Sequence, residues 1–235
     1  MDYLERYRNG DCEPVWAELQ SLGAAVRDEP NYSQALEVAA ETMRRVRRNC
    51  ERLVERLRSM DYKFGAYPDG STGYYTSGPL LRLDESSRDD IAALEEAVGP
   101  LPLSLVAFWE QVGSVDFVGM LRSWPTGLDP LVIEGPEAAI SALDDRDEMI
   151  DSIGHFEAAL APDALHKDNV SGGEPYAVEL PNAAADFMFL NERHNLLFVP
   201  YLRLAILRFG GFPGLDGGTA EFNSLPTLLD GLEPF

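Results

Sequence analysis

Three histidines are the side chains best suited to metal or acid–base chemistry in this 235-residue chain. A metal-dependent hydrolase would combine two of them with neighbouring carboxylates, which gives the set His166, Asp168, Asp186, Glu192 and His194. This set lacks the HxxxH or HExxH spacing that places two ligands on one helix face, and His155 adds no such spacing. Nothing fixes a facial triad of ligands either. We therefore expect no metal site.

Other catalytic signatures are equally incomplete. Ser171 lacks the first glycine of a nucleophile elbow, and Cys50 falls on an apolar helical seam where we expect a core residue. Neither Gly172-Gly173 nor Gly210-Gly211 is followed by the Lys-Ser/Thr pair of a phosphate-binding loop. We expect no catalytic residue and no cofactor. The alternative is a metal- or nucleotide-dependent enzyme that uses the polar loop His166–Gly173.

The charge balance is the strongest global property of the chain. Forty acidic and 19 basic side chains give a net charge of −21. Residues 1–60 hold 10 basic and 11 acidic groups, so almost all of the excess lies in residues 61–235. The excess negative charge of residues 61–235 repels the phosphate backbone of nucleic acids, so we expect no nucleic-acid binding. The charge serves either solubility or association with a basic protein partner.

A dense group of carboxylates marks the candidate partner-binding site. We expect a helix to begin at Pro136, with Ala139, Ile140 and Leu143 on its apolar side. Carboxylates crowd the second half of this helix, where they oppose the helix dipole. They form either a solvated face or a patch that seeks a cationic partner. The candidate residues are Asp144, Asp145, Asp147, Glu148 and Asp151.

Cysteine usage and the N-terminus indicate a cytoplasmic protein. Only Cys12 and Cys50 are present, without metal-ligand spacing, as expected in a reducing compartment. The sequence from Met1 lacks the basic-then-apolar order of a signal peptide, and no apolar run is long enough to span a membrane.

Residues 1–61 are predicted to form a helical hairpin. Apolar residues at helical spacing predict a first helix over residues 13–27. Two interleaved heptad series predict a second, longer helix; they are Leu36, Met43, Cys50, Leu57 and Ala39, Val46, Leu53, Met60.

Seven arginines between residues 44 and 58 resemble a nucleic-acid-binding stripe. Glutamates alternate with them, however, and the pairs Glu41–Arg45 and Arg47–Glu51 are four residues apart, where they can form ion pairs along a helix. We therefore favour a solvated face, or contact with the acidic part of the same chain.

Residues 62–235 are predicted to form one α+β domain. A helix over residues 91–98, a corner at Gly99–Pro102 and an aromatic-bearing second helix precede a strand at residues 114–121. Helices and strands follow in mixed order, with strands clustered late in the chain, which favours α+β over a doubly wound α/β fold. The further strands are expected around residues 74–76, 131–133, 154–162, 176–180 and 187–190, and further helices over 196–209 and 225–229.

The corner and its two helices resemble the opening of the SUKH superfamily, which includes bacterial immunity proteins and fungal cell-wall-assembly regulators. The residues that carry the resemblance are Leu94, Glu95, Gly99, Leu101, Pro102, Phe108, Trp109 and Gly113. Val112 stands where family members usually carry Asn, and the Gly-Asp pair of their later strands is absent here. The resemblance implies a sheet with helices packed on it.

The function that charge and resemblance favour is an acidic protein-binding module. The SUKH resemblance implies an immunity protein that neutralises a toxin delivered by neighbouring bacteria, frequently a nuclease. One alternative is the enzyme that would use the loop His166–Gly173. The other is a regulatory scaffold protein, which would also bind a protein partner.

Overall fold

The computed structural model describes residues 2–67, 71, 78–81, 85–217 and 223–235, and it shows the expected α+β architecture. The longer helices are α2 (Cys12–Ser21), α3 (Asn31–Ser59), α4 (Glu85–Val98), α5 (Leu103–Gln111) and α7 (Arg146–Ile153). Shorter helices are α1 (Tyr3–Arg8), α6 (Pro136–Ser141), α8 (Ala164–Lys167), α9 (Phe198–Arg203) and α10 (Leu225–Leu229). Among these described residues, no helix is both long enough and apolar enough to cross a membrane.

Strands form small antiparallel sheets among the helices. One sheet has the order β2 (Leu80–Leu81), β3 (Ser114–Asp116) and β5 (Val132–Ile133). Two-stranded sheets pair β1 (Lys63–Phe64) with β4 (Gly119–Met120), and β6 (Phe156–Ala161) with β7 (Tyr176–Leu180). The amide N–H of Glu134, just after β5, donates a 2.7 Å hydrogen bond to the carbonyl of Leu160 in β6.

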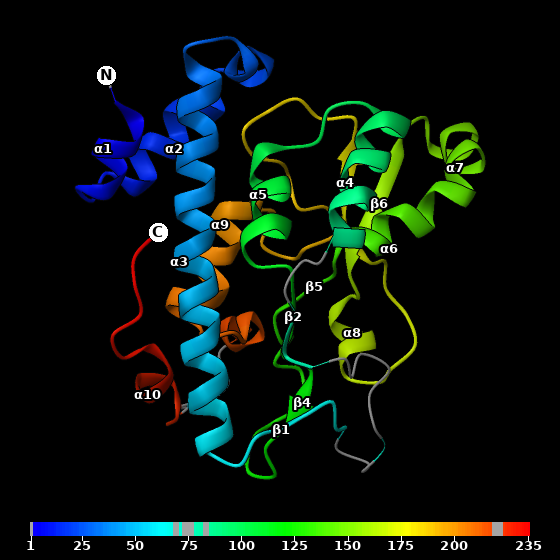
Figure 1. The fold of residues 1–235 in the computed structure, drawn as a ribbon. Coiled ribbons are helices and arrows are strands. Elements are labelled where there is room, and N and C mark those ends of the chain that lie inside the picture. The colour runs from blue at the N-terminus through cyan, green and yellow to red at the C-terminus, as the bar shows by residue number, and fades with distance from the viewer. Residues whose placement is uncertain (1, 68–70, 72–77, 82–84, 218–222) are drawn as a thin grey trace.

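The predicted heptad helix is confirmed as α3, which runs along one side of the molecule (Figure 1). Seven of its eight heptad residues lie within α3, and six of these seven are buried; Leu36 is 38% exposed. The seam therefore contributes to the core, and Cys50 lies in it, where burial raises its pKa to about 12. One face of α3 packs against α1, and another packs against α5, so residues 1–61 share one hydrophobic core with the rest of the chain.

The helix predicted over residues 13–27 is wrong in its second half. The helix α2 ends at Ser21, and a 3-10 helix, η1 (Gly23–Arg27), follows. Gly23 adopts φ +53°, a left-handed conformation that ends an α-helix. The helix α1 was not predicted, because six residues are too few to show a period.

The arginines of α3 contact the same chain, as favoured from the sequence. Arg45 and Arg47 pair with Glu41 and Glu51 along the helix. Arg48 and Arg52 both form ion pairs with Glu233, at 2.7 and 2.8 Å. The C-terminal segment thus lies alongside α3 in an extended form, as Figure 1 shows in red.

The predicted helix–corner–helix is confirmed. Gly99 ends α4 with φ +94°, Pro102 precedes α5, and Gly113 follows α5 with φ +85°. The ring N–H of Trp109 donates to the carbonyl of Glu134 at 3.0 Å, which joins α5 to the strand region. The corner is therefore a central part of the core.

Two predicted strands are only partly formed. The strand expected over residues 114–121 divides into β3 and β4, because the Asp116 carboxylate accepts from the amide of Val118 and turns the chain there. Residues 187–190 form isolated bridges at Met188 and Leu190 rather than a strand. The strand expected around residues 74–76 lies outside the described residues. The strands β5, β6 and β7 agree with the sequence prediction.

Candidate functional site

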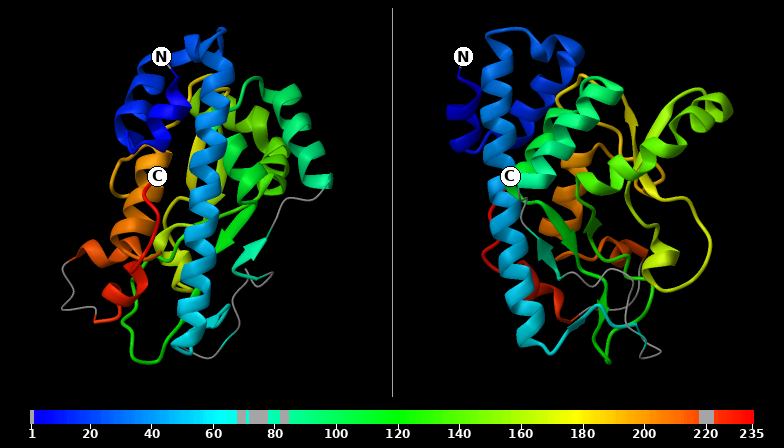
Figure 2. Two further views of the ribbon diagram at one scale, coloured as in Figure 1. Left: turned by 60° about the vertical axis from the view of Figure 1, so that its left-hand side comes forward. Right: turned by 45° about the vertical axis from the view of Figure 1, so that its right-hand side comes forward.

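The five predicted partner-binding carboxylates lie together on the 3-10 helix η2 (Ala142–Asp145) and on α7, and all five are exposed. We name these residues, together with Ile150 and Ile153, the α7 surface. Figures 1 and 2 show α7 projecting from the body at the side opposite α3. Within the described part of the chain, none of the five carboxylates forms an ion pair or a side-chain hydrogen bond. Their charges are therefore directed at solvent.

The electrostatic reason given for this site from the sequence is wrong. The helix that begins at Pro136 ends at Ser141, and α7 is a separate helix. Asp147 and Glu148 occupy the first turn of α7, where negative charge is favourable to the helix dipole. Asp147 and Glu148 are therefore compatible with the local fold, whereas Asp151 lies in the second half of α7, and Asp144 and Asp145 are the last two residues of η2.

Two exposed isoleucines accompany the carboxylates and were not predicted. Ile150 is 37% and Ile153 is 49% exposed. At 100° per residue, Asp147 and Asp151 share one stripe of α7, and the isoleucines form the neighbouring stripe. The α7 surface thus offers an apolar contact beside a group of unpaired negative charges.

The α7 surface is held by contacts at both ends of its helix. Gly154 ends α7 in a left-handed conformation, and its amide donates to the carbonyl of Ile150 at 2.9 Å. At the start of α7, the Arg146 guanidinium donates to the carbonyl of Ala97 at the end of α4. Met149 packs against the core, and its sulfur accepts from the amide of Glu157. The carboxylates are therefore presented by an anchored element.

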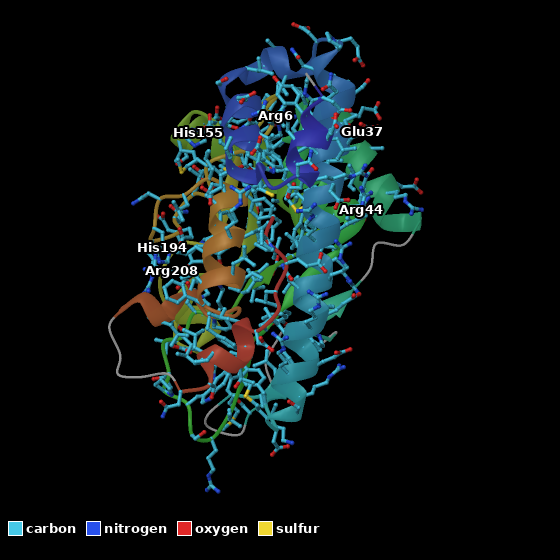
Figure 3. The ribbon with its side chains drawn as sticks, turned by 90° about the vertical axis from the view of Figure 1, so that its left-hand side faces the viewer. Arg6, Glu37, Arg44, His155, His194 and Arg208 are labelled. Carbon is cyan, nitrogen blue, oxygen red and sulfur yellow. The ribbon has the colours of Figure 1, made fainter. Side chains whose placement is uncertain are left out.

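The histidines each pair with one nearby carboxylate. His155 contacts Glu157, and this hydrogen bond raises the pKa of His155. His166 contacts Asp163, and His194 contacts Glu192. Figure 3 shows His155 and His194 well apart. Among the described residues, no group of three or more His, Cys, Asp or Glu side chains is arranged to hold a metal ion.

The remaining acidic residues of the hypothetical metal set have structural partners of their own. Asp168 accepts a 2.7 Å hydrogen bond from the amide of Gly127. Asp186 accepts from the hydroxyl of Ser104 at 2.7 Å, deep in the core.

The loop that follows β6 is stabilised by its own polar groups. The Asp163 carboxylate accepts from the amide of Leu165 at the start of α8 and also contacts His166. Gly173 lies so close to Asp163 that a Cβ atom there would be 2.4 Å from the carboxylate. Asp163 and His166 therefore serve the turns of the loop itself.

A fully buried ion pair lies behind this loop. The Lys167 ammonium donates to Asp129 at 2.6 Å, and both side chains are inaccessible to solvent. The Tyr176 hydroxyl donates to the second oxygen of Asp129 at 3.0 Å, and its ring lies 4.5 Å from the ammonium. This cluster fixes α8 against β7 and was not predicted, because its members are 38 and 47 residues apart.

The five predicted partner-binding carboxylates lie together on the α7 surface, whereas the residues of the hypothetical metal set have separate partners. Comparison with known proteins adds no relative: no family model, curated protein or solved structure matches the chain.

Proposed function

We propose that this chain is an acidic protein-binding module that captures a basic protein on its α7 surface. The observation that carries the proposal is the group of five exposed carboxylates, which form no ion pair with any residue that the structure describes and lie beside two exposed isoleucines on an anchored helix. Charges of one sign accelerate the encounter with a partner of the opposite sign. A partly exposed apolar stripe supplies area that a partner can bury.

The distribution of the basic residues supports this proposal. The arginines of α3 lie against Glu41, Glu51 and Glu233 of the same chain, so part of the positive charge is used internally. No side-chain ion pair balances the carboxylates of the α7 surface within the described residues. A basic partner would supply that balance.

The finer proposal is an immunity protein that neutralises a nuclease-type toxin. It rests on the resemblance of residues 91–113 to the SUKH superfamily. A nuclease must be basic where it meets its phosphate substrate. An acidic surface that projects from the body can occupy such a basic cleft and exclude the nucleic acid.

The test requires the cognate basic protein, which is to be sought among the neighbouring reading frames and purified as a catalytically inactive variant. Calorimetric titration at low and high salt compares the wild type with a variant in which the five carboxylates become Asn or Gln. We expect at least tenfold weaker binding of this variant at low salt and a smaller dependence of affinity on salt. Equal affinities of the two proteins at both salt concentrations would refute the site.

A matched control separates the local surface from the global charge. Neutralising five exposed carboxylates elsewhere changes the net charge equally: Glu55, Glu96, Glu110, Glu174 and Asp230. We expect this control to weaken binding less than threefold. Ile153→Ser tests the apolar stripe, and it should weaken binding without changing the salt dependence. For the immunity function, cells that produce the active toxin should survive with the wild type and the control, but die with the α7 variant.

A further inference from the structure

A large groove lies on another side of the molecule, between α2 and the helical segment formed by α9 and the π-helical turn η3 (Leu204–Arg208). Its volume is about 1080 Å³. Figure 3 faces this side: Arg208, which lines the groove, is labelled there on the segment that lies below the N-terminal helices. Small-molecule sites in proteins typically have volumes of roughly 300–1,000 Å³. The groove is therefore large enough for a ligand.

The walls of the groove are mostly apolar. Trp16 and Phe235 are buried and line it, while a series of partly exposed side chains forms the opposite wall. These partly exposed residues are Leu196, Leu197, Pro200, Leu204 and Leu207. Water in contact with this wall would be released when an apolar molecule binds, which favours binding.

The main polar feature of the groove is the guanidinium of Arg203. Its Nε donates to the main-chain oxygen of Phe235, but its Nη2 is buried and has no hydrogen-bond partner among the described residues. A buried donor without a partner destabilises the folded protein. Arg203 as a whole is partly exposed and lines the groove, so a ligand there can contact its side chain.

Charged groups of both signs line the groove. Arg208 is exposed at the groove and adds a second guanidinium. Two acidic side chains also line the groove. Glu13 is exposed to solvent, and the oxygens of Asp186 already accept hydrogen bonds from Ser104 and the amide of Val199. Arg203 therefore remains the group with an unused donor.

The wall that carries Arg203 has an unusual backbone. The amide of Phe209 donates to the carbonyl of Leu204, five residues earlier, at 3.2 Å. This π-helical turn is less regular than an α-helix, and such turns occur frequently at functional sites. Leu204, Leu207 and Arg208 all belong to it and line the groove.

We propose that this groove binds a small amphipathic carboxylate, whose hydrocarbon body lies along the leucine wall and whose carboxylate pairs with the guanidinium of Arg203. The site is independent of the α7 surface, since the two share no residue.

The probe for this site is decanoate, and decyltrimethylammonium is the comparison with the same chain and the opposite charge. Isothermal titration of the full chain should show saturable binding of one decanoate, at least tenfold tighter than decyltrimethylammonium. Arg203→Gln should weaken decanoate binding tenfold or more. Arg58→Gln removes an exposed arginine of α3 outside the groove and should leave the affinity unchanged.

A second variant keeps the test valid if Arg203→Gln does not fold. Leu207→Asp places a negative charge on the partly exposed leucine wall without touching Arg203, and it should abolish decanoate binding. The proposal is overturned if decanoate does not saturate, if decyltrimethylammonium binds equally well, or if Leu207→Asp binds decanoate like the wild type. A folded Arg203→Gln protein with unchanged affinity would also overturn it.

Discussion

The hydroxyl of Ser104 donates a 2.7 Å hydrogen bond to the carboxylate of Asp186, which is 2% exposed. The same carboxylate accepts from the amide of Val199 at the start of α9. One buried side chain thus joins the first turn of α5, next to the Leu-Pro corner, to the first turn of α9 beside the groove. Burial raises the pKa of Asp186 to about 6.

This pKa makes the stability of the fold depend on pH. The folded protein binds more protons than the unfolded chain between about pH 4 and pH 6, because the pKa of Asp186 is higher in the folded state. The stabilisation of the folded state by protonation of Asp186 is fully present below about pH 4, and it is lost as the pH rises through 6. Asp186→Asn is neutral throughout. Its free energy of unfolding, relative to the wild type, should therefore rise by on the order of 2 kcal/mol between pH 4 and pH 7.

Urea unfolding of both proteins at four pH values measures this difference. Taking the difference removes the titration of other groups, such as Asp116, whose pKa burial raises to about 7. A difference that stays constant with pH would show that Asp186 does not titrate in this range.

We expect the C-terminal segment to depend more on the side-chain amide of Asn49 than on the ion pairs of Glu233. Asn49 is fully buried; its side-chain amide donates to the carbonyl of Glu233 and accepts from the amide of Glu233, both at 2.8 Å. Asn49→Ala leaves two main-chain groups without partners, so it should lower the free energy of unfolding by about 1–3 kcal/mol. Glu233→Gln should cost about 0–1 kcal/mol, because its side chain is 31% exposed. Chemical denaturation compares the variants, and an equal or larger loss for Glu233→Gln would contradict this order.

Helices were predicted where the apolar period is long. The 29-residue helix α3 shows its period several times over, so its position and its buried seam follow from the sequence alone. Its glutamate partners within the helix were also predictable, since they are four residues away. Glu233, the partner of Arg48, is 185 residues distant, and no local pattern identifies it.

The strands were less predictable because most of them have only two or three residues. Tertiary contacts then decide where pairing stops. The turn at Asp116 divides one predicted strand, and Leu190 pairs with Ala177 at a single bridge only. Longer alternating segments such as Tyr176–Leu180 show their period and were predicted with their bounds.

The carboxylates of the α7 surface could be predicted from the sequence only because they are close together in the chain. Whether they lie at the start or the end of a helix depends on the break between Ser141 and Arg146, which apolar spacing did not reveal. The groove combines α2, Asp186 and α9, which are far apart in the chain, so the sequence alone does not reveal it.

The break before α7 changes the expected effect of neutralising its carboxylates. Asp147→Asn and Glu148→Gln remove negative charge from the first turn, so each should lower the free energy of unfolding by about 0.3–1 kcal/mol at low salt. Asp151→Asn, in the second half of α7, should cause no loss. Thermal unfolding at low and high salt measures these changes. Stabilisation of the protein by Asp147→Asn and Glu148→Gln would contradict a favourable interaction of these carboxylates with the start of α7.

The buried pair of Lys167 and Asp129 gives the largest expected effect. Lys167→Met leaves the Asp129 carboxylate buried without a cation, and it should lower the free energy of unfolding by about 3–5 kcal/mol. The double variant Lys167→Met/Asp129→Asn removes the buried charge and should recover part of this loss. Asn suits position 129, because Asp129 has φ +48° and Asn tolerates left-handed conformations.

Tyr176→Phe serves as the control for Lys167→Met. It removes one hydrogen bond to Asp129 while the ion pair remains, and it should cost only about 1 kcal/mol. Guanidinium unfolding of the three variants distinguishes the contributions. If the double variant is less stable than Lys167→Met alone, the loss comes from packing of the lysine stem and not from the uncompensated carboxylate.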